Sequence, residues 1–455
     1  MPEGPLKAQT LKGFRDFLPE QMVLRQHVIG TLRRVFEQHG FEPLETPTLE
    51  YAETLEGKYG DEERLLYRFT DQGDRRVGMR YDLTVPLARV VGQYVNSLAF
   101  PFKRYQIQPV WRADRPQKGR YREFYQCDAD IVGTSSPLAD AECVSLYYEG
   151  LRDLGFVNYQ TLLNSRKLLT AIGIYAGAGE QAGGIFRAID KLVKIGEPGV
   201  LDEMAASGVS SEAARRALDL AKMSEGRRDQ ADDLKLIANL RQPFADIPVG
   251  LEGLDELDAI VKLLPDFGVP DRYYKLDLTL ARGLNYYTGA VFEVVSQDIK
   301  IGSLGGGGRY DELVGIFSGR SIPTVGASFG LERIIDVIEE AKIGGALPRT
   351  TSAVFVTVFN ADLLADALAI TRELRAAGIN TEVAYEPGSG LKKQLDYAAR
   401  KGIGLAIIEG PDEQASGEVI LREVNLSGDK NTPRVQQSVL RSEVVAAVKA
   451  KLGMG

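Results

Sequence analysis

The last hundred residues of the chain repeat one simple pattern, and that pattern constrains the fold of this part most strongly. Apolar, strand-like runs at 354–359, 380–385 and 404–410 are separated by longer runs with helical spacing. Such an alternation predicts an α/β domain rather than a helical bundle or a β-sandwich. The preceding LPRT at 347–350 reads as a linker. We therefore expect a separate α/β domain over 350–455.

The rest of the chain differs in character, and 455 residues are too many for one core. Residues 21–40 show helical spacing, and the segment after them contains Pro43 and Pro47, which permit only an edge or boundary strand. Strand-like runs then alternate with turns and predict an antiparallel sheet, followed by a helix near 138–154. The strand-like runs are RRVGMRYDLTVPLARVV, FKRYQIQPVWRAD and YREFYQCDADIVG.

Short, polar, helical runs occupy residues 166–250 and predict a helical insertion. We place the insertion at 171–255, so that it divides one domain into parts at 1–170 and 256–345. The second part returns to strands, a glycine loop and a final helix. The expected fold class is an α+β domain with an antiparallel sheet, a helical insertion and a C-terminal α/β domain.

Composition excludes several kinds of chemistry. The only histidines are His27 and His39, and the only cysteines are Cys127 and Cys143, so we expect no catalytic triad, no metal site in the protein and no disulfide framework. Carboxylates, arginines and a metal carried on phosphate must then supply the catalysis. The N-terminus lacks a signal peptide and no apolar run could span a membrane, which favours a reducing, cytoplasmic location.

The net charge of −8 disfavours a general nucleic-acid coat, but charge can be local. Residues 103–122 combine seven cations and one acid with three aromatic side chains, which indicates a polyanion site. The cations are Lys103, Arg104, Arg112, Arg115, Lys118, Arg120 and Arg122, the acid is Asp114, and the aromatic residues are Tyr105, Trp111 and Tyr121.

Three stretches carry residues suited to bind an anionic ligand or to let one approach the backbone closely. Residues 276–293, LDLTLARGLNYYTGAVFE, are apolar and strand-like, and Arg282 among them needs an anion if it is buried. Residues 108–133 read as strand, basic loop and strand, with a loop suited to wrap a triphosphate or an RNA end. Residues 305–339 begin with four glycines, which allow close backbone approach to a ligand without forming a Walker loop.

Together these stretches resemble the histidyl-tRNA synthetases, which are class II aminoacyl-tRNA synthetases. RGLNYY resembles the family's histidine signature, QPVWRADRPQKGRYREFYQ its motif 2, and VGASFGLERII its motif 3. LKGFRDFLPEQ resembles the N-terminal element, and the helix 21–39 with Pro47 resembles motif 1, which forms the dimer interface. Residues 353–455 are similar to the anticodon-binding domain of several class II synthetases.

The resemblance implies a role for each matching residue. Arg112, Arg282 and Arg333 would hold phosphates and stabilise charge during catalysis. Asp114, where the family often has Glu, would meet adenine, and Asn285 replaces the usual aspartate, so we give it no charge-based role. The histidine-binding residues would be Asp82, Thr84, Gln126, Asp130, Tyr286 and Tyr287; Arg120 would join the ATP site, and Gln117, Lys118 and Arg120 would contact the tRNA acceptor end.

The same resemblance implies the ligands and the assembly. ATP with Mg²⁺, L-histidine and tRNA(His) would be the substrates, and the enzyme would be a homodimer. The C-terminal domain carries 12 Lys and Arg against 13 Asp and Glu over 350–455, hence a charge of −1. Anticodon recognition would therefore depend on local contacts to unstacked bases, with Phe359 and Tyr385 as candidate stacking residues.

Other interpretations fit parts of the chain. A regulatory subunit of ATP phosphoribosyltransferase shares the core, but such paralogues generally lack the anticodon domain and the catalytic arginines. A tRNA-sensing module without catalysis is a second possibility, and a prolyl- or threonyl-type synthetase a third, although neither of those types explains RGLNYY. The sequence AKMSE at 221–225 resembles the KMSKS loop of class I synthetases, but no HIGH sequence accompanies it, so we interpret it as chance.

Overall fold

The computed structural model describes residues 7–117, 119–179, 182–227, 229–281, 286–344, 348–427, 429 and 435–454. The chain forms two compact units, one of residues 1–16 and 28–345 and the other of residues 17–27 and 346–455. Within the described ranges, no helix combines the length and the apolar character needed to cross a bilayer.

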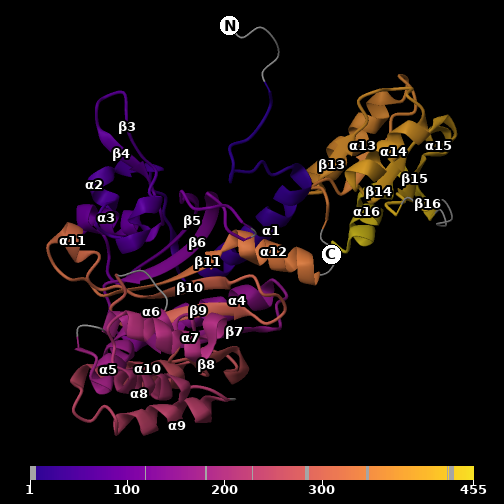
Figure 1. The fold of residues 1–455 in the computed structure, drawn as a ribbon. Coiled ribbons are helices and arrows are strands. Elements are labelled where there is room, and N and C mark those ends of the chain that lie inside the picture. Colours follow the sequence, from indigo (N-terminus) through magenta and orange to yellow (C-terminus); the bar gives the residue numbers. More distant parts are fainter. Residues whose placement is uncertain are drawn as a thin grey trace. The chain divides into compact units, whose positions relative to one another are not determined.

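An eight-stranded sheet forms the centre of the first unit (Figure 1). Its strand order is β1-β5-β6-β11-β10-β9-β7-β8, and neighbours are antiparallel except for the two edge pairs β1–β5 and β7–β8. The strands are β1 (Glu42–Pro43), β5 (Phe102–Trp111), β6 (Glu123–Val132), β7 (Tyr159–Ser165), β8 (Tyr274–Leu276), β9 (Ala290–Ser296), β10 (Ser303–Arg309) and β11 (Thr324–Gly330).

Two groups of elements flank this sheet. A small antiparallel sheet of order β2-β4-β3 lies with α2 and α3 on one side, and helices α5 to α10 gather beside β7, β8 and β9 (Figure 1). The bounds are β2 (Leu49–Tyr51), β3 (Arg68–Thr70), β4 (Arg76–Met79), α1 (Pro19–Gln38), α2 (Ala52–Leu55), α3 (Thr84–Tyr94), α4 (Pro137–Asp153), α5 (Arg166–Ala176), α6 (Ala182–Ile189), α7 (Leu192–Ala206), α8 (Ser211–Lys222), α9 (Gln230–Arg241), α10 (Pro248–Leu263), α11 (Gly315–Ser318) and α12 (Leu331–Ala341).

One predicted strand is a helix. The run RRVGMRYDLTVPLARVV contains β4, but its second half is α3. The side chain of Asp82 accepts a hydrogen bond from the Val85 amide at 3.0 Å where this helix begins, and Pro86 lies in the first turn, which tolerates proline. The residues from Val85 to Ala88 are buried in succession, so no polar position marks the helical period in the first part of α3.

The glycine run is also not the predicted loop, because it forms β10 in the middle of the sheet. A Cβ on Gly305 would lie 2.6 Å from the Ser328 carbonyl oxygen, and one on Gly308 would lie 2.5 Å from the Ala290 carbonyl oxygen. A Cβ on Gly307 would collide with the carbonyl of Gly326. The glycines therefore let the backbones of β9, β10 and β11 pack closely. Of the four glycines, Gly305 and Gly306 line the cavity described below.

The stretch 276–293 is not one continuous strand either. Strand β8 ends at Leu276 and β9 begins at Ala290, with turns between them. Residues 282–285, and with them Arg282 and Asn285, lie outside the described residues.

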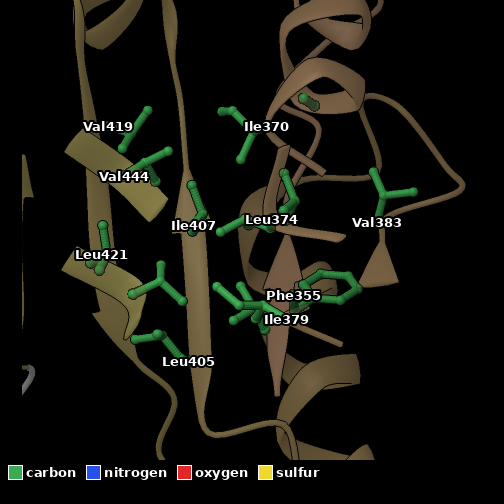
Figure 2. Close-up of a cluster of buried hydrophobic side chains, with 14 of the residues drawn as sticks. Phe355, Ile370, Leu374, Ile379, Val383, Leu405, Ile407, Val419, Leu421 and Val444 are labelled. Atoms are coloured by element: carbon green, nitrogen blue, oxygen red, sulfur yellow. The ribbon is translucent and has the colours of Figure 1, made fainter. Parts of the chain in front are cut away.

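The second unit contains the predicted α/β domain, built on a sheet of order β13-β12-β14-β15-β16. Strands β12, β13 and β14 are parallel, and the last two are antiparallel. Figure 2 shows its core, in which Phe355, Ile407 and Leu421 of the sheet meet Ile370, Leu374 and Val444 of the helices. The elements are β12 (Val354–Val356), α13 (Leu364–Ala376), β13 (Thr381–Val383), α14 (Leu391–Lys401), β14 (Leu405–Ile408), α15 (Pro411–Ser416), β15 (Glu418–Glu423), β16 (Gln436–Leu440) and α16 (Val444–Leu452).

The expected fold class is thus confirmed. The chain has an α+β domain with a largely antiparallel sheet, a helical region over α5–α10 and a C-terminal α/β domain. The sequence pattern missed two elements of that last domain, the short helix α15 and the edge strand β16. Phe359 and Tyr385 follow β12 and β13 and are 47% and 85% exposed.

His39 lies just after α1, and its ion pairs lead us to expect a pH-dependent contribution to the stability of the protein. Its Nδ1 lies 3.3 Å from a carboxylate oxygen of Glu142 and its Nε2 lies 3.2 Å from one of Glu149, and Lys103 also contacts Glu142 at 2.6 Å. The hydrogen bond to Glu142 raises the pKa of His39, although partial burial opposes the change. The stabilisation is therefore complete below the unfolded pKa of about 6.5 and is lost as pH rises through the higher folded pKa.

We expect His39→Gln to lower the free energy of unfolding by roughly 0.5–1 kcal/mol at pH 6 and by less at pH 9. Urea unfolding at the two pH values measures the difference, with His27→Gln, an exposed histidine of α1, as the control. An equal loss for His39→Gln at both pH values would contradict the ion-pair explanation.

Candidate active site

A cavity of about 280 Å³ lies over the sheet, between the β5–β6 loop and residues 286–287. Strands β6, β10 and β11 supply its floor through Gln126, Gly305, Gly306 and Ser328. Nine of the predicted site residues line this one cavity, although they come from distant parts of the sequence. They are Asp82, Thr84, Arg112, Asp114, Arg120, Gln126, Tyr286, Tyr287 and Arg333.

A larger cavity of about 630 Å³ is also lined by Tyr286. Among the predicted residues that the structure describes, Tyr286 alone lines it, and glycines and exposed loop residues make up much of its wall. The grouping of the charged and aromatic residues therefore selects the smaller cavity as the candidate active site.

Asp82 forms an acidic corner of the cavity at the beginning of α3. Its Oδ1 accepts hydrogen bonds from the Val85 amide at 3.0 Å and the Tyr59 hydroxyl at 3.1 Å, and its Oδ2 lies 3.5 Å from the Tyr286 hydroxyl. Burial raises the pKa of this carboxyl group, which is 1% exposed. A cation bound beside it would offset the cost of burying the ionised form, so the corner suits an ammonium group.

Gln126 on β6 offers a second acceptor in the cavity. Its amide nitrogen donates to Ser328 Oγ at 3.0 Å, which directs its carbonyl oxygen elsewhere. That Oε1 atom is buried and has no hydrogen-bond partner among the described residues. A buried acceptor without a donor is unfavourable, so a donor on a ligand would satisfy it.

Asp130 lies behind the cavity wall rather than in it. Its carboxylate forms an ion pair with Arg104 at 2.8 Å and accepts a short hydrogen bond from the Tyr310 hydroxyl. Both aspartates of this strand face, Asp128 and Asp130, are 3% exposed. Arg104 and Tyr310 already bind the carboxylate of Asp130. A contact between Asp130 and a substrate ring therefore stays a prediction.

Burial, together with the neighbouring Asp130, raises the pKa of Asp128 to about 7. Burial also raises the pKa of Asp130, and the nearby Arg104 opposes the rise at both carboxyl groups. Tyr287, which lines the cavity, has a raised pKa because it is buried close to both carboxylates. Its phenol remains protonated and can donate a hydrogen bond to a ligand.

Arg104 and Tyr310 are site-supporting residues that motif matching missed. Arg104 is fully buried and also contacts Gln106 Oε1 at 3.0 Å and the Leu83 carbonyl at 3.2 Å. The signal was present in the two-residue period of β5, which places Arg104, Gln106 and Gln108 on one strand face. Tyr310 follows the glycine strand directly, and its partner became visible only through the pairing of β10, β11 and β6.

Two arginines line the opposite part of the cavity. Arg112 donates from Nε to the Tyr81 carbonyl at 3.1 Å, and its guanidinium carbon lies 4.2 Å from the Tyr81 ring centroid and 5.0 Å from that of Phe124. Arg333 on α12 donates to the Ser303 carbonyl at 2.9 Å and to the Gly119 carbonyl at 3.3 Å. These contacts hold both guanidinium groups at the cavity, where they can bind an anion such as phosphate.

The β5–β6 loop, residues 112–122, carries the remaining predicted groups. Asp114 pairs with Arg120 at 2.9 Å, and its Oδ1 accepts from the Arg115 amide at 2.7 Å, so its contact with adenine stays a prediction. Gln117 lies at the tip of the loop and does not line the cavity, and Lys118 lies outside the described residues.

The predicted basic run 103–122 is therefore not one polyanion site. Lys103 pairs with Glu142, and Arg104 is buried with Asp130. Tyr105 and Trp111 donate hydrogen bonds to Glu37 and Glu123. Successive side chains of β5 point to opposite faces of the sheet, and these residues have protein partners on both faces. Within this run, the loop after Trp111 is therefore the part that retains cations for a ligand.

The sequence AKMSE at 221–225 has a structural role at the end of α8. The Ser224 hydroxyl donates to the Ala221 carbonyl at 3.0 Å and accepts from the Leu278 amide at 3.1 Å. It thus connects the helical region to the segment after β8, and it does not line the candidate active site.

The largely antiparallel sheet, the two arginines at the cavity and the C-terminal α/β domain together are those of an enzyme with the class II aminoacyl-tRNA synthetase fold. A family model described as histidyl-tRNA synthetase matches residues 13–334, and one described as anticodon binding domain matches residues 353–451. The chain belongs to the histidyl-tRNA synthetase family.

Individual relatives agree over almost the full chain. The histidine–tRNA ligase of Cytophaga hutchinsonii is 41% identical over 446 residues, covering 93% of this chain and 97% of the relative. That of Gloeobacter violaceus is 40% identical, covering 93% and 96%. The crystal structure of histidyl-tRNA synthetase from Nostoc sp. PCC 7120 superposes with a TM-score of 0.87 at 32% identity, covering 98% of this chain and all of that one.

Proposed function

We propose that this protein is a histidine–tRNA ligase, which activates L-histidine with ATP and transfers it to the 3′ end of tRNA(His). The observation that carries the proposal is one cavity that joins two subsites. The buried Asp82 and the unsatisfied Gln126 oxygen suit an α-ammonium group, and Arg112 and Arg333 suit phosphate. An amino acid and a nucleotide can thus meet there.

The first step needs no nucleophile from the protein. A carboxylate oxygen of histidine attacks the α-phosphorus of ATP, the bond to the β-phosphate oxygen breaks, and pyrophosphate leaves. Positioning and stabilisation of the developing charge then supply most of the catalysis. We assign the stabilisation to Arg112, Arg333 and, by family resemblance, Arg282.

In the second step a hydroxyl of the terminal tRNA ribose attacks the carbonyl carbon of the adenylate. AMP leaves and the hydroxyl proton is released, so the histidyl ester forms. We assign contacts with the acceptor end to Gln117, Lys118 and Arg120 of the β5–β6 loop, and contacts with the anticodon to the C-terminal domain.

We assign histidine recognition to Asp82, Thr84 and Gln126 for the amino group and to Tyr286, Tyr287 and Asp130 for the ring side. An imidazole has one donor and one acceptor nitrogen, which a phenol and a carboxylate together can read. Amino acids with apolar side chains would leave these buried polar groups unpaired and would be rejected strongly.

ATP would enter with Mg²⁺ on its phosphates. The described residues contain no group of three or more acidic, cysteine or histidine side chains that could hold a metal ion, so phosphate oxygens would supply most ligands. Glu332, which lines the cavity and is 5% exposed, is a carboxylate of the kind that Mg²⁺ accepts. The ion would neutralise charge on the phosphates.

We also propose that the protein is a homodimer and is located in the cytoplasm.

ATP–pyrophosphate exchange with each amino acid in turn, without tRNA, tests the activation step. We expect exchange with histidine alone. No exchange with any amino acid from folded protein would favour a regulatory or tRNA-sensing paralogue. Exchange with another amino acid would contradict the assignment of Tyr287 and Asp130. Attachment of histidine to tRNA(His) then tests the second step.

A further inference from the structure

A tight turn near the N-terminus, residues 11–14, packs against the β5–β6 loop. The Phe14 amide donates to the Leu11 carbonyl at 3.0 Å, and Gly13 has a φ of +91°, which favours glycine. The turn and the loop belong to the same compact unit. The mechanism described above uses no residue of this turn.

Arg122 connects the turn to the loop. Its amide donates to the Gly13 carbonyl at 3.0 Å, and its Nη1 donates to the Lys12 carbonyl at 3.2 Å. On its other side, Arg122 Nε donates to the Asp114 carbonyl at 3.0 Å, and its own carbonyl accepts from the Arg112 amide at 2.9 Å. One residue thus joins the turn to the backbone of two predicted ATP-binding residues.

Arg15 makes a second, independent contact with the loop. Its guanidinium carbon lies 3.3 Å from the ring centroid of Tyr121, within the range of a strong cation–π contact. Tyr121 lines the active-site cavity, and no ligand-binding role was assigned to Arg15 from the sequence. The side chain of Arg15 therefore supports a wall of the cavity from outside.

The fit at Gly13 is close. A Cβ at this position would lie 2.8 Å from Cδ of Arg122 and 2.9 Å from Cγ of Pro116, both in the loop. Any other residue at this position would have to displace these side chains of the loop. The turn and the loop thus hold each other in one arrangement.

We propose that the N-terminal turn with Arg15 is a positioning element for the ATP site, which acts by holding the β5–β6 loop in its ligand-binding arrangement. This inference rests on the proposed function. The loop carries Arg112, Asp114 and Arg120, whereas the proposed amino-acid subsite lies on α3, β6 and residues 286–287. Loosening the loop therefore weakens the use of ATP and leaves histidine binding unchanged.

Histidine-dependent ATP–pyrophosphate exchange by the full chain tests the proposal. We expect Arg15→Ala to raise the KM for ATP by about three- to tenfold, while the KM for histidine changes by less than about twofold. Lys7→Ala, which removes an exposed cation from the same segment, is the matched control and should leave both values unchanged. A merely structural role for Arg15 would alter the two KM values together.

Gly13→Ala provides a second variant with its own control. Gly40 also has a positive φ, +75°, but a Cβ there would meet no atom within 4 Å. Gly40→Ala therefore reproduces the backbone strain without the collision. We expect a rise in the KM for ATP in Gly13→Ala alone, at an unchanged circular dichroism spectrum and unfolding midpoint.

A double-variant cycle locates the effect of Arg15. Replacing Arg15 by alanine should change the KM for ATP little when Tyr121 is already replaced by leucine, because the contact between the two side chains is then absent. Additive effects, or an unchanged KM for ATP in folded Arg15→Ala and Gly13→Ala, would overturn the proposal. In those cases the wild-type chain still exchanges with histidine, whereas failure of the proposed function would abolish exchange in the wild type too.

Discussion

Arg112→Ala is expected to lower kcat/KM for histidine-dependent exchange by about 10²- to 10³-fold, or roughly 3–4 kcal/mol. The guanidinium of Arg112 is held at the cavity by the Tyr81 carbonyl and by the rings of Tyr81 and Phe124. It is thus oriented before the negative charge on the α-phosphate develops. Steady-state exchange at varied ATP concentration measures the loss, most of which should appear in kcat.

Two variants separate charge from geometry at this position. Arg112→Lys keeps the charge but loses the planar fork, so an intermediate loss is expected. Arg115→Ala removes an exposed cation of the same loop that does not line the cavity, and its activity should stay within about twofold of wild type. Near-wild-type activity of Arg112→Ala would refute the role of this arginine.

Arg309→Leu is expected to destabilise the protein by about 3–5 kcal/mol. Arg309 on β10 pairs with Asp140 on α4, with Nε 3.2 Å from Oδ1, and its Nη1 donates to the Thr134 carbonyl at 2.9 Å. The two residues are 5% and 2% exposed. Burial already raises the pKa of Asp140 to about 6 despite this partner, so removing the arginine leaves a costly buried carboxylate.

Urea unfolding followed by circular dichroism measures this cost. Arg34→Leu is the comparison, because it breaks an ion pair with Asp153 in which the arginine side chain is 51% exposed, and it should cost less than about 1 kcal/mol. The double variant Arg309→Leu with Asp140→Leu should recover much of the loss. If the double variant were less stable than Arg309→Leu, the buried charge would not be the cause.

Much of the fold was predictable from local pattern. The period of the C-terminal domain predicted its parallel strands and longer helices, because those strands are buried and α13 packs an apolar face against them, as Figure 2 shows for Ile370 and Ile407. The short helix α15 buries no side chain and was missed. Helix α3 was missed because its first part, from Val85 to Ala88, is buried in succession and has no polar position to mark a helical period. Strand β10 was missed because glycine has low strand propensity, and only the approach of its neighbours explains it.

The candidate site was predictable where a motif places functional residues close together in the sequence. Arg112, Gln126 and Arg333 belong to such motifs, and all three line the cavity. The partners of Asp130 could not be predicted in this way, because Arg104 and Tyr310 reach it through strand pairing across the sheet. Sequence motifs thus indicated which residues face the ligand and left open which residues hold them.

The glycine strand has a consequence for how this protein can vary. Every single-base change in a glycine codon that does not preserve glycine or introduce a stop adds at least a Cβ atom. At Gly305, Gly307 and Gly308 that atom would meet a neighbouring backbone, and at Gly326 it would collide with the Asp130 carboxylate. These glycine positions in and beneath the cavity floor are therefore closed to one-step missense change, and new specificities in this lineage would have to arise at other positions around the cavity.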